Sequence, residues 1–442
     1  MKKSMTIRRL LGVLVTISIL GTGCGMGQAV PELYVDDSIP EMPITVFTQN
    51  VEVSEAIEER CKAVLNQDGS TNITVYSDSA NYYADEGLSY RELLLKRLSS
   101  GTADDLYLIP AEDVLEFDEK GYIYDMTNLS FTENLSQDAL IQSTYDGKVF
   151  SLPLSYTCFG FIWNVDMLKK YDLELPENLD EFLNVCETLK KNGILPYGAN
   201  KDYGLTVPAM CAGLYDLYQG EGSEQKVEAV SDGTVPVSEY MEKGFEFLQM
   251  MIDKGYMDPV RALNTMPSRE EEKNFFMEGN CAFICALYRK KAFVDYPFEI
   301  AMTALPVLEN GSVCVVGADQ RLAVNPGSKH LDAAIAIVEA LGEASTLDSF
   351  ANNLGKISSS KNATAPDIPQ GEAIIACIAK GEQIPNQDFR LNFNVWDTVR
   401  DLSQQLCEGR SAAEVAAEYD SRQMEEISIY GGRGQEQADN KE

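Results

Sequence analysis

Residues Tyr145–Trp163 read YDGKVFSLPLSYTCFGFIW, and at this stretch the pattern of the chain changes. The stretch begins with an Asp-Gly turn and continues as an extended apolar run that contains Pro153. Strand-like apolar runs alternate with amphipathic helical segments before it, and a second series of the same kind begins with Phe159–Trp163. Because 442 residues are too many for one compact core, the sequence predicts an α/β protein of two lobes.

The spacing of apolar residues predicts the individual elements of both series. The predicted strands are Ile44–Thr48, Asn72–Tyr76, Asp105–Ile109, Phe159–Trp163 and Cys281–Ala286. The predicted helices are Val53–Asn66, Tyr90–Ser99, Asn178–Lys191, Ser238–Lys254, Leu331–Leu341 and Trp396–Glu408, together with one that begins at Ser268 and closes at Gly279. Capping boxes of Asn178 with Glu181 and of Ser411 with Glu414 mark two helix starts.

The charge balance excludes one class of function. The chain has 36 Lys and Arg against 69 Asp and Glu, a net charge of -33, whereas nucleic-acid binding depends on cations that neutralise phosphates. We therefore expect no nucleic-acid partner. The chain has a single histidine, His330, which we expect to be solvated. One histidine is too few for most His-based zinc sites, and having only one weakens any proposal of a Ser-His-Asp triad. We expect no metal and no cofactor.

The N-terminal residues have the composition of an export signal. Basic residues within Met1–Arg9 precede the apolar run Leu10–Leu20, and small residues precede Cys24. The segment resembles a bacterial lipoprotein signal, with Gly21 where such signals usually have leucine, and ordinary secretion is the alternative. We expect a signal peptide over 1–23, lipidation of Cys24, a tether over 24–42 and a flexible tail over 431–442. Lipid on Cys24 would hold the protein at the outer face of the bacterial cell membrane.

Nine of the ten cysteines follow Cys24, and most of them lie inside apolar runs. We expect buried thiols that behave as small hydrophobic side chains. Cys281 and Cys285 do not form a zinc site in this interpretation, because four residues of strand separate them by about 13 Å.

Five segments, taken in order, resemble the extracellular solute-binding proteins of ATP-driven importers, in the sugar-binding family that includes the maltose-binding protein. The segments are Leu88–Leu108, Tyr145–Asn164, Leu175–Pro196, Phe275–Phe283 and Leu354–Lys361. The third reads LPENLDEFLNVCETLKKNGILP and is similar to the family pattern P-x-T-W-D-E … L-K-x-x-G-x-x-P, with Asn178-Leu179 in place of Thr-Trp. The resemblance extends from about Ile44 to about Glu425.

The resemblance implies an α/β fold of the two-lobed, periplasmic-binding-protein type II, with a ligand cleft between lobes that a crossover hinge joins. The first lobe would comprise 43–153 and 313–355, and the second 154–312 and 356–430. The chain would first cross near Leu152–Cys158, return near Cys314 and leave again after Leu354. The resemblance also implies a monomer that delivers a small molecule to the membrane permease subunits of an importer.

In the second lobe the resemblance indicates five ligand-binding residues. Trp396 matches a position at which the family stacks an aromatic ring on sugar, and the alternative is a core tryptophan. Tyr288 and Arg289 follow a strand end where the family often has an aromatic residue in the cleft, and a core tyrosine is the alternative. Asp202 and Tyr203 match a ligand loop, with a solvated turn as the alternative.

In the first lobe the candidates follow predicted strands, where open α/β sheets bind ligands. Gln49 and Asn50 come after the first strand, and Glu112 comes after the third. Tyr82 and Tyr83 lie in a long polar loop and could cover a ligand, and plain surface exposure is the alternative.

The main hypothesis is therefore an extracellular lipoprotein that captures a carbohydrate by closure of its lobes. A glycoside hydrolase with two carboxylates is a competing hypothesis, but 69 acidic residues make such a pair undiagnostic, and no G-x-S-x-G or H-E-x-x-H motif is present. We expect no catalytic residue. The same fold could instead bind peptides, polyamines or an anion, or serve a membrane sensor. Asp105 is expected to be structural, and Trp163 a core residue.

Overall fold

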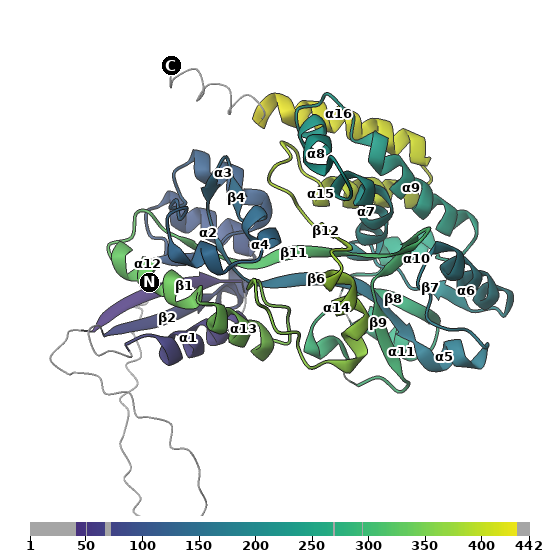
Figure 1. Cartoon of the computed structure of the whole chain (residues 1–442), viewed down its shortest axis with the longest axis horizontal. Helices are drawn as coiled ribbons and strands as arrows, with labels where there is room; N and C mark the ends of the chain where they lie inside the picture. Colours follow the sequence, from purple (N-terminus) through teal and green to yellow (C-terminus); the bar gives the residue numbers. More distant parts are fainter. Residues whose placement is uncertain (1–40, 50, 67–71, 268–269, 294, 431–442) are drawn as a thin grey trace, which may run out of the picture.

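The computed structural model describes residues 41–49, 51–66, 72–267, 270–293 and 295–430, which form two lobes side by side (Figure 1). The first lobe holds β1 (Met42–Thr48), α1 (Val51–Val64), β2 (Ile73–Ser79), the 3-10 helix η1 (Ala80–Glu86), α2 (Tyr90–Ser99), β3 (Leu106–Leu108), η2 (Ala111–Asp113), α3 (Val114–Glu119), η3 (Ser130–Asn134), α4 (Gln137–Ile141), β4 (Thr144–Tyr145), β5 (Lys148–Val149), α12 (Leu331–Leu341) and α13 (Ala344–Asn353).

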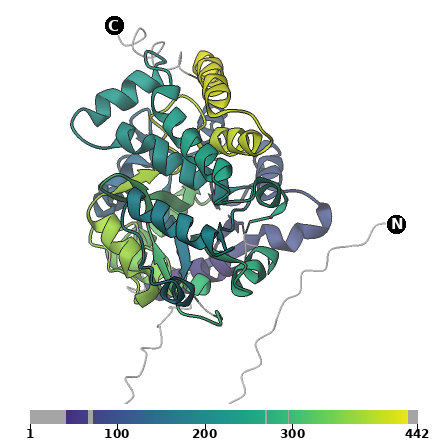
Figure 2. The same cartoon turned by 90° about the vertical axis from the view of Figure 1, so that its right-hand side faces the viewer.

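The second lobe is larger and richer in helix. It holds α5 (Val165–Lys170), α6 (Leu179–Lys191), β7 (Leu195–Tyr197), α7 (Tyr203–Tyr218), α8 (Ser223–Ser231), α9 (Ser238–Asp253), α10 (Pro259–Asn264), α11 (Glu270–Met277), β8 (Cys281–Leu287), η4 (Lys290–Phe293), β9 (Ile300–Thr303), β10 (Leu305–Leu308), η5 (Pro369–Gly371), α14 (Glu372–Ala379), β12 (Gln383–Pro385), α15 (Trp396–Cys407) and α16 (Ala412–Tyr430). Seen from the end of this lobe, helices flank the strands on both sides (Figure 2).

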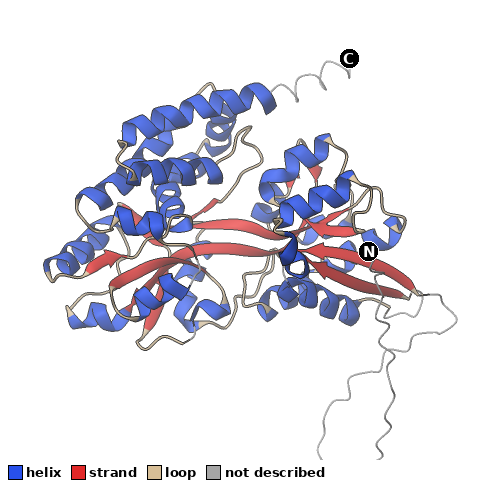
Figure 3. Ribbon diagram, turned by 180° about the vertical axis from the view of Figure 1, so that it is seen from behind, coloured by secondary structure: helices blue, strands red, loops and turns tan. Residues whose placement is uncertain are grey.

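Two long strands, β6 (Leu152–Asn164) and β11 (Gly311–Val324), run through both lobes (Figure 3). They pair antiparallel with each other at the centre of a sheet whose order is β2-β1-β3-β11-β6-β8-β7. The end of β11 pairs with β3 in the first lobe, while the later part of β6 pairs with β8 and β9 in the second. The lobes are therefore joined by hydrogen-bonded strands, as the two-lobed fold requires.

The crossing region of β11 has local features that suit a hinge. Gly317 lies so close to the side chain of Asn386 that a Cβ atom at this position would be 2.4 Å from the Asn386 amide. Gln320 has a φ of 49°, a left-handed conformation that is uncommon for a residue other than glycine. Asp319, between them, forms an ion pair with Lys356. Burial raises the pKa of the Asp319 carboxyl, but Lys356 and neighbouring hydrogen bonds outweigh burial and leave that pKa below its ordinary value.

The third crossing follows α13. The backbone N–H of Tyr156 donates to Ile357 O over 2.8 Å, and the Ser359 hydroxyl donates to Pro153 O over 2.5 Å. The backbone N–H of Lys361 still donates to Asn134 O in the first lobe. The chain therefore stays in contact with the first lobe as far as Lys361.

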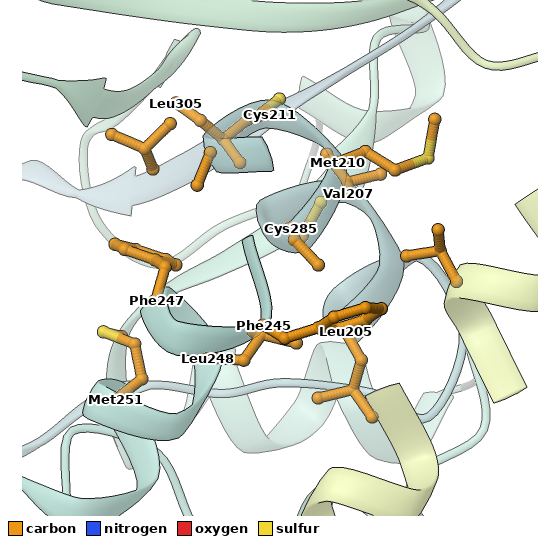
Figure 4. Packing of buried hydrophobic residues seen from close by; sticks show 14 of the residues in the cluster. Leu205, Val207, Met210, Cys211, Phe245, Phe247, Leu248, Met251, Cys285 and Leu305 are labelled. Carbon is orange, nitrogen blue, oxygen red and sulfur yellow. The ribbon is translucent and has the colours of Figure 1, made fainter. Parts of the chain in front are cut away.

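The core of the second lobe forms around α7, which the apolar periodicity did not predict as a helix. Its side chains are buried from Tyr203 to Leu214, and they pack on α9, β8 and β10 (Figure 4). The close approach of α7 and α9 requires Gly244, because a Cβ there would lie 2.1 Å from Ala209 O. Trp163 is fully buried in this core, as expected, and its Nε1–H donates to Thr303 Oγ1 over 2.9 Å.

Asp105 and the thiols have the structural roles expected of them. The Asp105 carboxylate accepts hydrogen bonds from the Thr45 backbone N–H and the Ser328 hydroxyl, at 2.8 and 2.6 Å. All nine cysteines of the described residues are free, and eight of them are buried. Burial raises the pKa of the Cys281 thiol to about 12. Within the same residues no cluster of His, Cys, Asp and Glu could hold a metal ion, and no helix has the length and apolarity to cross a bilayer.

Candidate functional site

The parallel strands β1, β2 and β3 end at one edge of the sheet, and the segments that follow β1 and β3 contact the second lobe. In the first turn of α1, Glu52 Oε1 forms an ion pair of 2.9 Å with Lys291 Nζ of η4. After β3, Ala111 and Asp113 of η2 line a cavity of about 270 Å³ together with Gln387, Phe389, Leu391, Phe393 and Asn394, which lead into α15. The strand ends of the first lobe are thus opposite η4 and the segment before α15.

Three aromatic rings form a cluster on the second lobe, beside the crossing strands. The ring of Phe159, on β6, lies 5.4 Å from the ring of Tyr203 and 5.2 Å from that of Trp396. Tyr203 is the first residue of α7, and Trp396 is the first residue of α15. Tyr203 is buried, whereas Trp396 is only half-buried. Two helix N-termini therefore converge on one aromatic surface.

Asp202 and Arg400 lie at the same helix ends. Asp202 is the N-cap residue of α7, but its side chain does not cap the helix. Its Oδ1 atom is buried, has no hydrogen-bond partner in the described part of the chain, and lies 4.0 Å from Arg400 Nη1. Burial raises the pKa of the Asp202 carboxyl; Arg400 opposes this shift, and Asp397 adds to it. Asp202 thus has a buried oxygen with free acceptor capacity beside an aromatic cluster.

Hydrogen bonds of buried polar side chains fix the position of Tyr203. The Tyr203 hydroxyl donates to Glu272 Oε2 over 3.3 Å, and Asn200 Nδ2 donates to Glu272 Oε1 over 2.5 Å. The Asn200 Oδ1 atom accepts from the backbone N–H groups of Asp202 and Gly204, at 3.0 and 2.9 Å. The start of α7 is therefore held by side chains from two other segments.

Arg289 and Tyr288 have different surroundings, although they are adjacent. Arg289 is exposed and lines a cavity of about 170 Å³ together with Tyr203, Glu272 and Lys291. Tyr288 is 2% exposed and packs on Phe293 with the ring centroids 5.4 Å apart. Burial raises the pKa of Tyr288 to about 12. The structure thus places Tyr288 in the core and not with the aromatic cluster, which matches the alternative of a core tyrosine.

The first-lobe candidates are more dispersed. Gln49 is exposed and directly follows β1, and Asn50 lies outside the described residues. Glu112 is the middle residue of η2, which faces the segment before α15. The structure describes its backbone only.

Tyr82 and Tyr83 lie in η1. Tyr82 is 66% exposed, whereas the Tyr83 hydroxyl donates to Asp78 Oδ2 over 2.6 Å. The same Asp78 oxygen accepts from Arg97 Nη2 over 2.7 Å, so the hydroxyl of Tyr83 belongs to an internal network of the first lobe.

The structure therefore brings together Asp202, Tyr203 and Trp396, with Arg289 on an adjoining cavity. Sequence reasoning did not select Phe159, Arg400 or Glu272. Arg400 lies one helical turn after Trp396, a spacing that places both on one face of α15. Glu272 is an acid one turn before the apolar Phe276, so its position on the buried face of α11 could have indicated it.

Hydrogen-bonded strands join the two lobes, and polar and aromatic side chains of both line a cavity between them, an arrangement typical of proteins that close on a ligand. Residues 62–346 match the family model described as bacterial extracellular solute-binding protein. That match covers more than half of the 442 residues, and the chain belongs to this family.

Individual relatives are distant. The multiple sugar-binding protein of Streptococcus mutans is 22% identical over 359 residues, which cover 77% of this chain and 79% of that protein. Among solved structures, the apo form of RafE from Streptococcus pneumoniae superimposes with a TM-score of 0.68 at 15% identity, covering 89% of this chain and 100% of RafE. A Bacillus licheniformis sugar transporter protein in complex with stachyose gives 0.59 at 17% identity, covering 86% and 98%. At such identities the superpositions establish the fold.

Proposed function

We propose that this protein captures a carbohydrate between its lobes and delivers it to the permease of an ATP-driven importer. The observation that carries the proposal is the group formed by the Tyr203, Phe159 and Trp396 rings beside the Asp202–Arg400 pair. A sugar offers an apolar ring face and several hydroxyls, and it is bound by aromatic rings together with fixed donors and acceptors. The names of the relatives, which include a multiple sugar-binding protein, agree with this ligand class.

Binding works through lobe closure in this proposal. A ligand that touches both lobes binds the closed arrangement more tightly than the open one, and therefore shifts the population toward closure. The aromatic cluster would supply the second-lobe contacts, and Gln49 and the η2 segment with Glu112 those of the first lobe. The permease would recognise the closed shape, so no bond of the sugar needs to be broken.

The test is a thermal-shift screen of the purified protein against monosaccharides, oligosaccharides, peptides and polyamines. A ligand present at a hundred times its Kd stabilises the folded protein by about 2.7 kcal/mol, which is readily detected. We expect at least one carbohydrate to stabilise the protein. Stabilisation by a peptide or a polyamine with none by any sugar would contradict the ligand class and leave the fold in place.

Two further parts of the proposal have separate tests. We expect a fatty acid on Cys24, which lies outside the described residues, and mass spectrometry of protein from its host detects it. Purified protein from the host without N-terminal lipid would exclude the anchor. We also expect no hydrolysis of a panel of glycosides, and release of sugar by the pure protein would identify an enzyme.

A further inference from the structure

Residues 386–395, here named the strap, connect β12 to α15 and contact both lobes. The strap rises from the crossing strands into the space between the helices of the two lobes and then enters α15 (Figure 1). Its last residue, Val395, directly precedes Trp396. The path of the strap therefore determines the position of the Trp396 backbone, from which the ring extends.

One strap residue is held by the first lobe. Phe389 is 6% exposed and belongs to the hydrophobic cluster of that lobe with Phe47, Tyr107 and Phe150. The Arg321 guanidinium lies 5.4 Å from the centre of the Phe389 ring. An aromatic ring buried among apolar side chains and covered by a cation is a firm anchor, because leaving this position exposes the ring to water.

The following residues of the strap are held by the second lobe. Leu391 and Phe393 are each 3% exposed and belong to the core cluster of that lobe, where Phe393 lies 6.0 Å from Tyr419, ring to ring. Asn392 Nδ2 donates to Ser231 Oγ over 3.0 Å. The strap therefore passes from an anchor in one lobe to an anchor in the other within four residues.

Gln387 joins the two ends of the strap. This side chain is 8% exposed, and its Oε1 accepts from the backbone N–H of Val395 at 2.9 Å and of Trp396 at 3.5 Å. Its Nε2 donates to Phe393 O over 3.3 Å. Gln387, two residues before Phe389, is thus hydrogen-bonded to Trp396, the first residue of α15. A displacement at one end of the strap is therefore carried to the other.

We propose that Phe389 and Gln387 are positioning residues that set the Trp396 ring according to the arrangement of the lobes. While Phe389 occupies its site in the first lobe, the strap holds the start of α15, and Trp396 packs on Phe159. When the first lobe moves away, it withdraws this support, and the ring loses its fixed orientation. The proposal rests on the proposed function only in treating Trp396 as a ligand contact.

The first readout needs no ligand. Subtracting the emission spectrum of a Trp396→Phe variant isolates the contribution of Trp396, since Trp163 is the only other tryptophan and is fully buried. We expect Phe389→Ala to shift this emission to the red and to increase its quenching by acrylamide. Gln387→Leu should act in the same direction, and Phe389→Leu, which keeps an apolar anchor, should largely restore the original spectrum.

The matched control is Phe150→Ala. Phe150 is 1% exposed in the same first-lobe cluster, but it does not belong to the strap. We expect this variant to lower the melting temperature as Phe389→Ala does, while leaving Trp396 emission unchanged. Equal spectra for Phe389→Ala and the parent protein, or equal shifts for both alanine variants, would overturn the proposal.

The second readout is affinity for a sugar that stabilises the protein. We expect Phe389→Ala to weaken binding by about tenfold and Phe150→Ala by much less. An emission shift combined with unchanged sugar affinity would overturn the role of the strap in binding while leaving sugar capture intact. If no sugar binds the parent protein, the proposed function fails, but the emission experiment still decides whether the strap positions Trp396.

Discussion

Replacing Trp396 by leucine tests whether its indole is a ligand platform. A buried tryptophan removes about 150–250 Å² from water, and Trp396, packed against Phe159, keeps at most about a third of its surface exposed, so at most about 80 Å² remains for a ligand. At about 25 cal/mol per Å², this area contributes at most about 2 kcal/mol, or about 30-fold in Kd. Leucine keeps much of the packing on Phe159 and loses the ring that a sugar would cover.

The assay is isothermal titration calorimetry with a sugar from the thermal-shift screen, together with melting of the ligand-free protein. We expect Trp396→Leu to raise Kd by about 10- to 30-fold and to change the ligand-free melting temperature by only a few degrees. Phe247→Leu is the control for the loss of aromatic packing alone, because Phe247 is a buried residue of the same core on α9. An unchanged Kd with a large loss of ligand-free stability would refute the platform and make Trp396 a core residue.

Three further changes probe the site and the hinge. Asp202→Asn should weaken sugar binding by about tenfold and raise the ligand-free melting temperature at pH 7. The melting temperature should rise because burial raises the pKa of this carboxyl, so its charge destabilises the folded state. A lower ligand-free melting temperature would contradict this. Gly317→Ala should destabilise the protein, since the new Cβ would lie 2.4 Å from Asn386, and an unchanged denaturant midpoint would argue against the close contact at the hinge. The Asp319 carboxyl has a folded-state pKa below its ordinary value, so its ion pair with Lys356 stabilises the protein above about pH 4 and is lost as the pH falls through the folded-state pKa. Lys356→Met should therefore make acid unfolding less steep in this range, and identical acid-unfolding curves would show that the pair contributes nothing.

Several helices were predictable within one or two residues of their ends, and two of them to the residue. Tyr90–Ser99 and Leu331–Leu341 begin and end where their apolar periodicity indicates. The prediction failed for α7, in which nearly every side chain is buried, so that no polar face gives a period of 3.6 residues. Pro208 within this helix further disguised it, because proline is normally read as a helix breaker.

The candidate site was predictable only in part, and the reason is geometric. Asp202 and Trp396 could be selected one at a time, but their proximity depends on two helix starts far apart in the chain. Tyr288 and Arg289 follow the end of β8, where the strand's alternation no longer indicates their directions; Tyr288 enters the core, and Arg289 lines the cavity beside Tyr203. Sequence spacing carries no information about such long-range contacts.

The central claim is that a ligand draws the two lobes together. Small-angle X-ray scattering measures this directly, by comparing the radius of gyration of the protein alone with that of the protein saturated with a stabilising sugar. We expect a smaller radius of gyration and a shorter maximum dimension in the saturated protein. Identical scattering curves at proven saturation would contradict closure as the consequence of binding.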